Sequence, residues 1–296
     1  MHKSALMQLM ISMAIFGSVG FFSARTGLPA VELVFVRCVC AAAVLLAAWL
    51  LTGSFRRERW SVREALLIAA CGISNLLNWV FLFTAFRLVS VTIAISLYHL
   101  APFLALIAGG LIFRDKLGLP AILALAGCFA GTVLIMGGGG FGGASPSWKG
   151  MLCGVAAAFF YAATMVLGRS VSRTSVYATT LIQMAVGLLL LLPFVHFGAY
   201  AGLGRAAWSY AIATGVVHTG LVYLLFFGSI RRLPSPLVSV AVFVDPAVAI
   251  LLDIGVDGFR PDGWQTAGIL LLFGSLIAAF AVPLGRRARA QEGRAT

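Results

Sequence analysis

The residues of this sequence best suited to chemistry are a few charged and polar side chains inside long apolar runs. Asp245 lies midway along the apolar run 235–255, directly before Pro246. A proline removes one helical hydrogen bond, here to the carbonyl of Val242, and apolar surroundings tolerate such a break only where protein or a wet cavity satisfies the freed groups. An acid beside this break is suited to bind a cationic group or a proton, or to pair with a basic residue such as Arg37.

Two histidines lie in similar settings. His99 stands three residues before Pro102 in the run 89–112, and His218 lies deep in the run 207–228. A neutral histidine in such a place can pass a proton, or it can hydrogen-bond a neighbouring helix. Both interpretations stay open for each histidine.

A polar and aromatic group follows in another run. Asn75, Asn78 and Trp79 are spaced by three and four residues, so they share adjoining parts of one helix face. Two amides and an indole can bind the polar head of an amino acid and stack on its side chain, or they can simply bond neighbouring helices. Tyr161 and Tyr223 are further candidates for a cavity wall.

Glu32 and Arg37 share one apolar run. Glu32 is close enough to its end to reach water. Arg37 is deeper and requires an anion or a cluster of carbonyls, and its guanidinium could bind a carboxylate through two hydrogen bonds.

The composition places these residues in a membrane. Hydrophobic residues make up 61% of the 296 residues and charged residues only 10%, whereas a soluble domain has roughly 45–50% and about 25%. The net charge of +12 comes from short clusters between the apolar runs, which argues against a nucleic-acid partner. The five cysteines lie inside apolar runs, and no spacing of Cys or His suggests a metal site.

The apolar runs predict an all-α membrane protein with ten transmembrane helices. If the N-terminus is cytoplasmic, fifteen Lys and Arg lie inside, five lie outside and Arg37 lies within a span. This bias predicts a multi-pass protein of the bacterial inner membrane with both termini in the cytoplasm. The predicted spans are 5–24, 29–52, 65–85, 89–112, 119–138, 149–168, 175–195, 207–228, 235–255 and 264–284.

The chain also repeats itself at an offset of 144 residues, which aligns Trp79 with Tyr223 and Pro102 with Pro246. We therefore predict two five-helix repeats, 1–140 and 149–296, joined by a linker at 141–148. Because each repeat has an odd number of spans, the two enter the membrane from opposite sides, as in many transporters with a site at the repeat interface.

Together, the ten spans in two halves, the RRERW loop, the proline-centred fourth and ninth spans and the Arg in the second span resemble the EamA-type transporters of the drug/metabolite transporter superfamily, in particular bacterial exporters of amino acids, aromatic ones included. Pro102 with Asp115, Asp245 with Pro246, and Arg37 match the family pattern. The resemblance implies a helical bundle, a central cavity between the halves and alternating access. Because the family commonly has this Arg whatever the substrate, we assign Arg37, with Glu32, a structural or gating role.

The expected function is export of small metabolites, with amino acids favoured, by a secondary transporter. The alternatives are efflux of drugs or lipophilic cations and permeation of vitamins or other metabolites. A membrane-embedded enzyme is disfavoured because the four His and nine acids are scattered, so no catalytic residue is assigned. No phosphate-binding loop for ATP is present, and no cofactor is expected. The expected partners are a small-molecule substrate and the lipid bilayer, and the protein is expected to be a monomer or a weak oligomer.

Overall fold

The protein is described by a computed structural model that covers residues 2–58, 61–89, 94, 97–115, 118–137, 147–256, 258 and 260–292. Within these residues all regular structure is helical, which confirms the predicted all-α class. Most of the predicted linker 141–148 lies outside the described residues. The α-helices are α1 (His2–Gly17), α2 (Val19–Ala24), α3 (Ala30–Leu51), α4 (Val62–Leu88), α6 (Ala101–Phe113), α7 (Leu119–Gly137), α8 (Trp148–Ser170), α9 (Val176–Leu191), α10 (Arg205–Gly215), α11 (Val222–Ile230), α12 (Ser235–Ala241), α13 (Val244–Gly255) and α14 (Gly263–Glu292). Short 3-10 turns occur at Ser54–Arg57 (η1), Leu192–Phe194 (η2) and Phe197–Tyr200 (η3), and a π-helix, η4, at Val216–Leu221.

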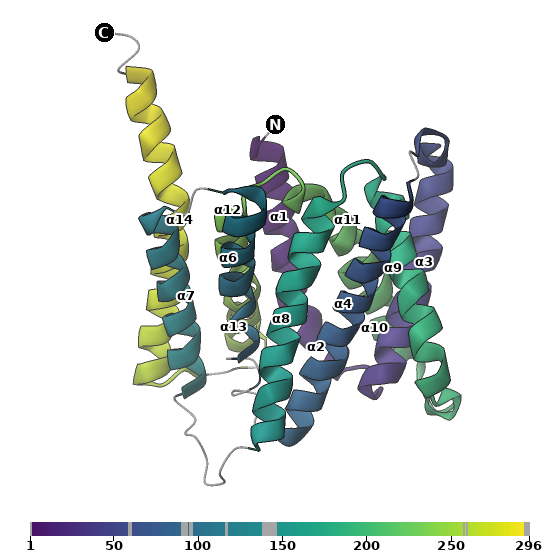
Figure 1. The fold of residues 1–296 in the computed structure, drawn as a ribbon. Helices are drawn as coiled ribbons and strands as arrows, with labels where there is room; N and C mark the ends of the chain where they lie inside the picture. Colours follow the sequence, from purple (N-terminus) through teal and green to yellow (C-terminus); the bar gives the residue numbers. More distant parts are fainter. Residues whose placement is uncertain are drawn as a thin grey trace.

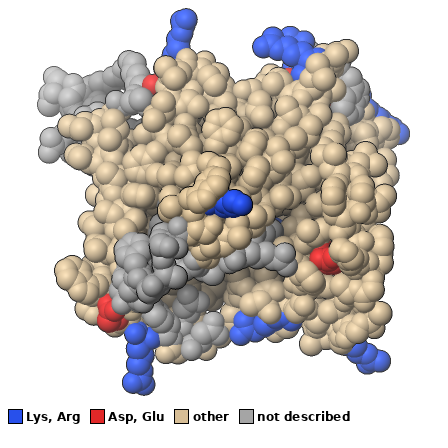
Figure 2. Space-filling model, turned by 60° about the horizontal axis from the view of Figure 1, so that its bottom comes forward, with Lys and Arg blue, Asp and Glu red and all other residues tan. Residues whose placement is uncertain are grey.

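The surface of the helices suits a membrane. Seven helical segments of the described residues are long and apolar enough to cross a bilayer, and three shorter apolar helices accompany them. Large apolar side chains point outward along these helices, as Leu51 and Leu111 do, with exposed fractions of 88% and 79%. Figure 2 shows one face, on which most Lys, Arg, Asp and Glu side chains lie near the rim and uncharged residues make up much of the area between them. The chain is therefore a multi-pass membrane protein.

The helices form a bundle in which partners distant in sequence pack side by side (Figure 1). α4 packs against α8, α3 against α9, α1 against α11, and α7 against α14. In the last pair, a Cβ added at Gly131 or at Gly268 would come within 2.7 Å of the other glycine's carbonyl oxygen. Such close approach of backbones is typical of helix pairs in membranes. The start of α1 and the end of α14 lie at the same end of the bundle.

Three predicted spans are not single regular helices. The run 5–24 divides at Ser18 into α1 and α2, and the run 207–228 contains η4 between α10 and α11. The run 235–255 divides at residues 242–243, because Pro246 has no N–H to continue the helix. The carbonyl of Val242 instead accepts a hydrogen bond from the backbone N–H of Asp245 at 3.2 Å.

The run 89–112 is described only in part, since residues 90–93, 95 and 96 lie outside the described part of the chain. Its described helix, α6, begins at Ala101 and carries Pro102 in its first turn, where a proline costs no hydrogen bond. His99 and Leu100 form a turn before it. Two proline-containing helix starts, those of α6 and α13, are thus available to line one site.

Candidate functional site

A cavity of about 410 Å³ lies among α1, α2, α3, α4, α6, α8, α11 and α13. Seven of the eight residues that we predicted to contact a substrate line it, and so do Pro102 and Arg37. The seven are Asn75, Asn78, Trp79, His99, Tyr161, Tyr223 and Asp245. The lining residues come from seven of the ten predicted apolar runs, which therefore meet around one space.

The amide side chains of α4 form hydrogen bonds to the helices around this cavity. Asn78 donates from its amide nitrogen to the carbonyl of Ala157 on α8 at 2.9 Å, and its amide oxygen accepts from the hydroxyl of Tyr98 at 3.4 Å. Asn75 accepts from the hydroxyl of Tyr223 at 3.2 Å. The amide nitrogen of Asn75 has no acceptor among the described residues, so this group can bind a ligand.

Aromatic rings form much of the wall. Tyr98 stacks on Tyr161 with ring centres 5.1 Å apart and planes 4° apart. Trp79 meets Tyr223 edge to face at 6.2 Å. Offset stacking and edge-to-face contacts are the favoured geometries of aromatic pairs, so the wall can accept an apolar or aromatic group in the same way.

Asp245 supplies the acid of the cavity. It stands in the first turn of α13, where the helix dipole favours a negative charge, and it is only partly exposed. Within the described residues, no group forms a hydrogen bond or ion pair with its carboxyl oxygens. Gly17 of α1 packs against its backbone carbonyl, which fixes the position of the helix break. The carboxyl group is therefore available to a cation or a proton.

Arg37 supplies the positively charged side chain of the cavity. Its exposed fraction is 6%, and its Nε donates to the hydroxyl of Thr219 at 3.0 Å. The guanidinium lies 5.1 Å from the ring centre of Trp79. Its two terminal amino groups have no acceptor among the described residues, and the ion pair with Asp245 that the sequence left open is not formed there. Arg37 can thus offer a carboxylate two donors while Thr219 holds it in place.

His218 lies outside the lining of this cavity, although we predicted it as a transport residue. Its Nε2 is 2.9 Å from the hydroxyl of Ser18, at the break between α1 and α2, and its ring lies 4.8 Å from that of Phe22. The π-helix η4 turns His218 toward this break and Thr219 toward Arg37. π-Helical turns often occur at functional sites, and this one positions residues for the site.

Glu32 does not reach water as the sequence suggested. Its exposed fraction is 3%, because the segment after α9 folds over it. Its Oε1 accepts from the backbone N–H of His196 at 3.1 Å and lies 3.3 Å from the Nδ1 of the same residue. Tyr200 donates from its hydroxyl to the backbone carbonyl of Glu32 at 2.9 Å. Glu32 faces a second pocket and not the central cavity.

A charged cluster closes the end of the bundle at which α1 starts, which we call the tied end. Arg169, near the end of α8, forms a two-pronged ion pair with Asp115, which follows α6. Arg169 also donates to the hydroxyl of Ser235 at 2.6 Å, and the backbone N–H of Ser235 donates to Asp115 at 2.8 Å. Burial opposes ionisation of Asp115, but the hydrogen bonds from Arg169 and Ser235 outweigh it and hold the pKa of Asp115 below its usual value.

A second tie joins α4 to the turn between α8 and α9. Glu64 accepts hydrogen bonds from the backbone N–H groups of Ser172, Arg173 and Thr174 at 3.1 to 3.2 Å. The sequence analysis did not predict the partners of Arg169 or of Glu64, because these partners come from distant parts of the chain. The signal that could have found Arg169 is its place at the end of the predicted span 149–168.

Among the described residues between the tied end and the cavity lies a gap of about 10 Å³, about the space for one water molecule. Its lining residues lie one helical turn from cavity residues on three elements: Ala105 from Pro102, Met165 from Tyr161, and Ser239 from Val242. The hydroxyl of Ser239 is buried there without a hydrogen-bond partner. The gap therefore lies between residues next to the cavity and Arg169, which also lines it.

Metal chemistry has no support in the described part of the chain, where no three His, Cys, Asp or Glu side chains lie together as ligands. The arrangement instead provides the carboxyl of Asp245, the guanidinium of Arg37, the imidazole of His99, amides and aromatic rings around one cavity. These are groups that bind a small molecule reversibly.

Comparisons with known proteins agree with this arrangement. The chain is 47% identical over 286 residues to a Bacillus subtilis protein named uncharacterized transporter YxxF, an alignment that covers 96% of this chain and 91% of that protein. A solved crystal structure shares the fold with a TM-score of 0.82 at 23% identity, and the match covers 97% of this chain and 99% of that one. Two stretches, residues 3–137 and 148–281, each match the EamA-like transporter family. The chain therefore belongs to the EamA-like transporter family.

Proposed function

We propose that this transporter carries small zwitterionic metabolites, with amino acids favoured, out of the cell across the bacterial inner membrane. The observation that carries the proposal is the pair of ionisable groups in the cavity: Arg37 and Asp245 both line it, and the described residues do not pair them with each other. Charged groups at this depth are costly unless a partner or water compensates them. A substrate with one carboxylate and one ammonium group would satisfy both, and the aromatic wall would hold its side chain.

The proposed architecture is ten spans in two inverted repeats, 1–140 and 149–296. The two family matches, 3–137 and 148–281, nearly coincide with these halves, the second starting at the last residue of the predicted linker. The contact of His99 with Phe243, at 5.4 Å between ring centres, also supports the repeat. These two residues are 144 positions apart, the offset of the sequence repeat, and residues that a two-fold axis relates can touch only close to that axis. The central cavity would then lie at the repeat interface, where such transporters bind substrate.

We propose that the tied end is the cytoplasmic gate of an alternating-access cycle. It lies at the end of the bundle where α1 starts and α14 ends, and the positive-inside bias assigns that end to the cytoplasm. The gap at Ser239 is too small for a substrate in this state. Separation of Arg169 from Asp115 would widen it and give Ser239 access to water or substrate. Passage would then need no ATP-binding module, and the substrate gradient or a proton gradient would drive it.

Efflux of lipophilic cations is the second candidate, because an acid among aromatic rings also suits a cation without a carboxylate. The two candidates differ in Arg37. A zwitterion uses its terminal amino groups, whereas a cation is repelled by them. Replacement of Arg37 by glutamine should therefore weaken transport of a zwitterion and strengthen transport of a cation.

The test is flux into and out of liposomes that contain the purified protein. The panel consists of aromatic and aliphatic amino acids, cationic dyes and water-soluble vitamins, each measured with and without a pH gradient. Protein-free liposomes and liposomes with Asp245→Asn serve as controls. We expect saturable flux of one or more amino acids that Arg37→Gln reduces. Flux of dyes alone, increased by Arg37→Gln, would replace the zwitterion proposal with cation efflux, and flux of vitamins alone would replace it with vitamin permeation.

A further inference from the structure

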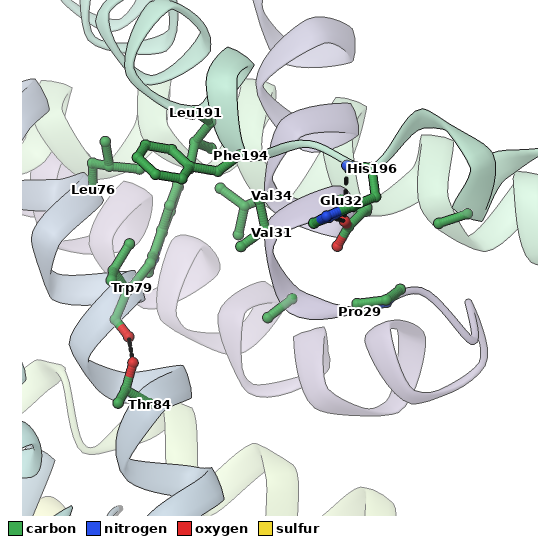
Figure 3. A pocket seen from close by; sticks show the side chains of 13 residues that line it. Pro29, Val31, Glu32, Val34, Leu76, Trp79, Thr84, Leu191, Phe194 and His196 are labelled. Carbon is green, nitrogen blue, oxygen red and sulfur yellow. Dashed lines mark hydrogen bonds and ion pairs between the residues drawn. The ribbon is translucent and has the colours of Figure 1, made fainter.

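A second pocket of about 420 Å³ lies beside the central cavity, where α3 begins and α9 ends. Figure 3 shows Trp79 and Phe194 toward one end of this pocket and Glu32 and His196 toward the other. We call it the Glu32 pocket. The residues that matter for its chemistry are Val31, Glu32, Val34, Trp79, Phe194 and His196.

Trp79 separates the two spaces, because it lines both the Glu32 pocket and the central cavity. Arg37 and Tyr223 contact its ring from the cavity. Apolar residues, among them Val34 and Leu76, surround it within a packed cluster. The guanidinium of Arg37 belongs to the central cavity alone, and it does not line the Glu32 pocket. The two spaces therefore offer different charges to a ligand.

Glu32 gives the pocket an anionic end. Its carboxyl group is nearly enclosed, yet only one of its oxygens, Oε1, has a hydrogen-bond donor among the described residues. The other oxygen is not among the buried atoms that lack a partner, so it retains access to the pocket. The neighbouring ring of His196, whose Nδ1 lies 3.3 Å from Oε1, has an exposed fraction of 88%.

Apart from Thr84, whose hydroxyl donates to the carbonyl of Val80, the remaining wall and the rim are apolar. Val31, Val34 and Trp79 line the interior, and Val80 and Phe194 stand at the rim with exposed fractions of 41% and 65%. These side chains give the pocket an apolar mouth beside the exposed His196. A ligand that enters there must carry an apolar body.

We propose that the Glu32 pocket binds lipophilic primary ammonium ions, with the ammonium group on the free oxygen of Glu32 and the apolar body along Val31, Val34 and Trp79. The charge of the ligand complements the carboxylate, and its N–H groups supply the missing donors. A zwitterion is disfavoured because the described lining has no cation for a carboxylate other than the exposed His196. A phospholipid with an amine headgroup is disfavoured for the same reason, since its phosphate would lack a partner. The site is independent of the proposed transport function.

The test is equilibrium dialysis of radiolabelled 2-phenylethylammonium against the purified protein in phosphatidylcholine nanodiscs. The neutral isostere 2-phenylethanol is the matched ligand control. Binding is measured in the Asp245→Asn background, where the central cavity has lost its acid and cannot hold the probe by charge. We expect saturable binding in this background that Glu32→Gln weakens about tenfold or more. His196→Ala removes the one competing cation of the described lining and should keep or strengthen binding.

A separate variant controls for loss of folding, because Glu32 also forms hydrogen bonds with the segment after α9. Val31→Trp fills the pocket and leaves Glu32 in place, so it should abolish binding while thermal unfolding of the purified protein stays unchanged. Equal binding of the alcohol, unchanged binding in both Glu32→Gln and Val31→Trp, or loss of binding in Asp245→Asn would each overturn the proposal. Binding that disappears when phosphatidylethanolamine replaces phosphatidylcholine would assign the pocket to a lipid headgroup instead. Amino-acid flux is not measured here, so failure of this site leaves the transport proposal to its own test.

Discussion

The tied end and the central cavity use the same kinds of residue for opposite purposes. At the tied end Asp115 has Arg169, the hydroxyl of Ser235 and a backbone N–H as partners. In the cavity Asp245 has no partner among the described residues, and Arg37 uses only its Nε. An unpaired charge in an apolar environment is costly. The paired charges of the tied end therefore stabilise the conformation seen here, whereas the unpaired charges of the cavity favour binding of a ligand that compensates them.

The comparison predicts that the largest effect comes from removal of the cavity acid. Asp245→Asn keeps the shape of the side chain and removes its charge. We expect flux of the preferred substrate to fall about tenfold or more, because an ammonium group loses its only acidic partner in the described lining. Normal insertion is expected, since the substitution removes an uncompensated charge. Flux in liposomes, normalised to the amount of protein inserted, measures the effect.

The matched control is Asp262→Asn, which changes an exposed acid before α14 that caps Gln265. It should leave flux unchanged. Wild-type flux in Asp245→Asn at every pH would show that this carboxylate has no part in transport.

The cavity residues could be predicted from sequence to a larger extent than their partners. Asp245 and Pro246 lie together in an apolar run, and an acid beside a helix break is conspicuous without a structure. Asn75, Asn78 and Trp79 share a face because helical spacing is regular. The break of the run 235–255 at residues 242–243 also follows from the proline.

The partners could not be predicted, because they depend on where distant helices meet. His218 resembles His99 in sequence, yet η4 turns it toward Ser18 and away from the cavity. Glu32 lies near the end of a predicted span, and only the fold shows that the segment carrying His196 covers it. Both outcomes arise from irregular backbone, a π-helix and a loop, which apolar periodicity does not encode.

A smaller effect is expected at the tied end, where each charge is already compensated. Asp115→Asn or Arg169→Gln removes hydrogen bonds to charged groups, each worth about 1.5–3 kcal/mol. This loss should shift the population toward a state in which the gap at Ser239 is open. In a cysteine-free background, a cysteine placed at Ser239 should react faster with a water-soluble thiol reagent in either variant. The double variant should resemble the single ones, because both remove one interaction.

The same tie should depend on pH. The pKa of Asp115 lies below its usual value, so the tie is fully present above the usual range of an aspartate and is lost as the pH falls through the lowered pKa. Labelling of the cysteine at Ser239 should therefore rise only in acid, after correction for the reactivity of the reagent. Asp115→Asn should abolish that rise. A cysteine that labels equally fast in all variants and at all pH values would contradict the assignment of a gate.

The smallest effect on transport is expected from a substitution that leaves both Arg37 and Asp245 in place. Trp79→Phe keeps an aromatic ring between Arg37 and the Glu32 pocket but shortens it. The edge-to-face contact with Tyr223 and the contact with the guanidinium of Arg37 should weaken. An aromatic pair is worth about 0.5–1.5 kcal/mol beyond its buried area, so the apparent affinity for an aromatic amino acid should fall roughly two- to tenfold.

Trp79→Ala removes the partition altogether and should reduce flux further while folded protein remains in the membrane. Concentration-dependent flux of phenylalanine and of alanine separates the two roles of the ring. A substrate-stacking role lowers affinity for phenylalanine more than for alanine, whereas a role as a partition lowers both equally. Unchanged flux in Trp79→Ala would remove Trp79 from the site.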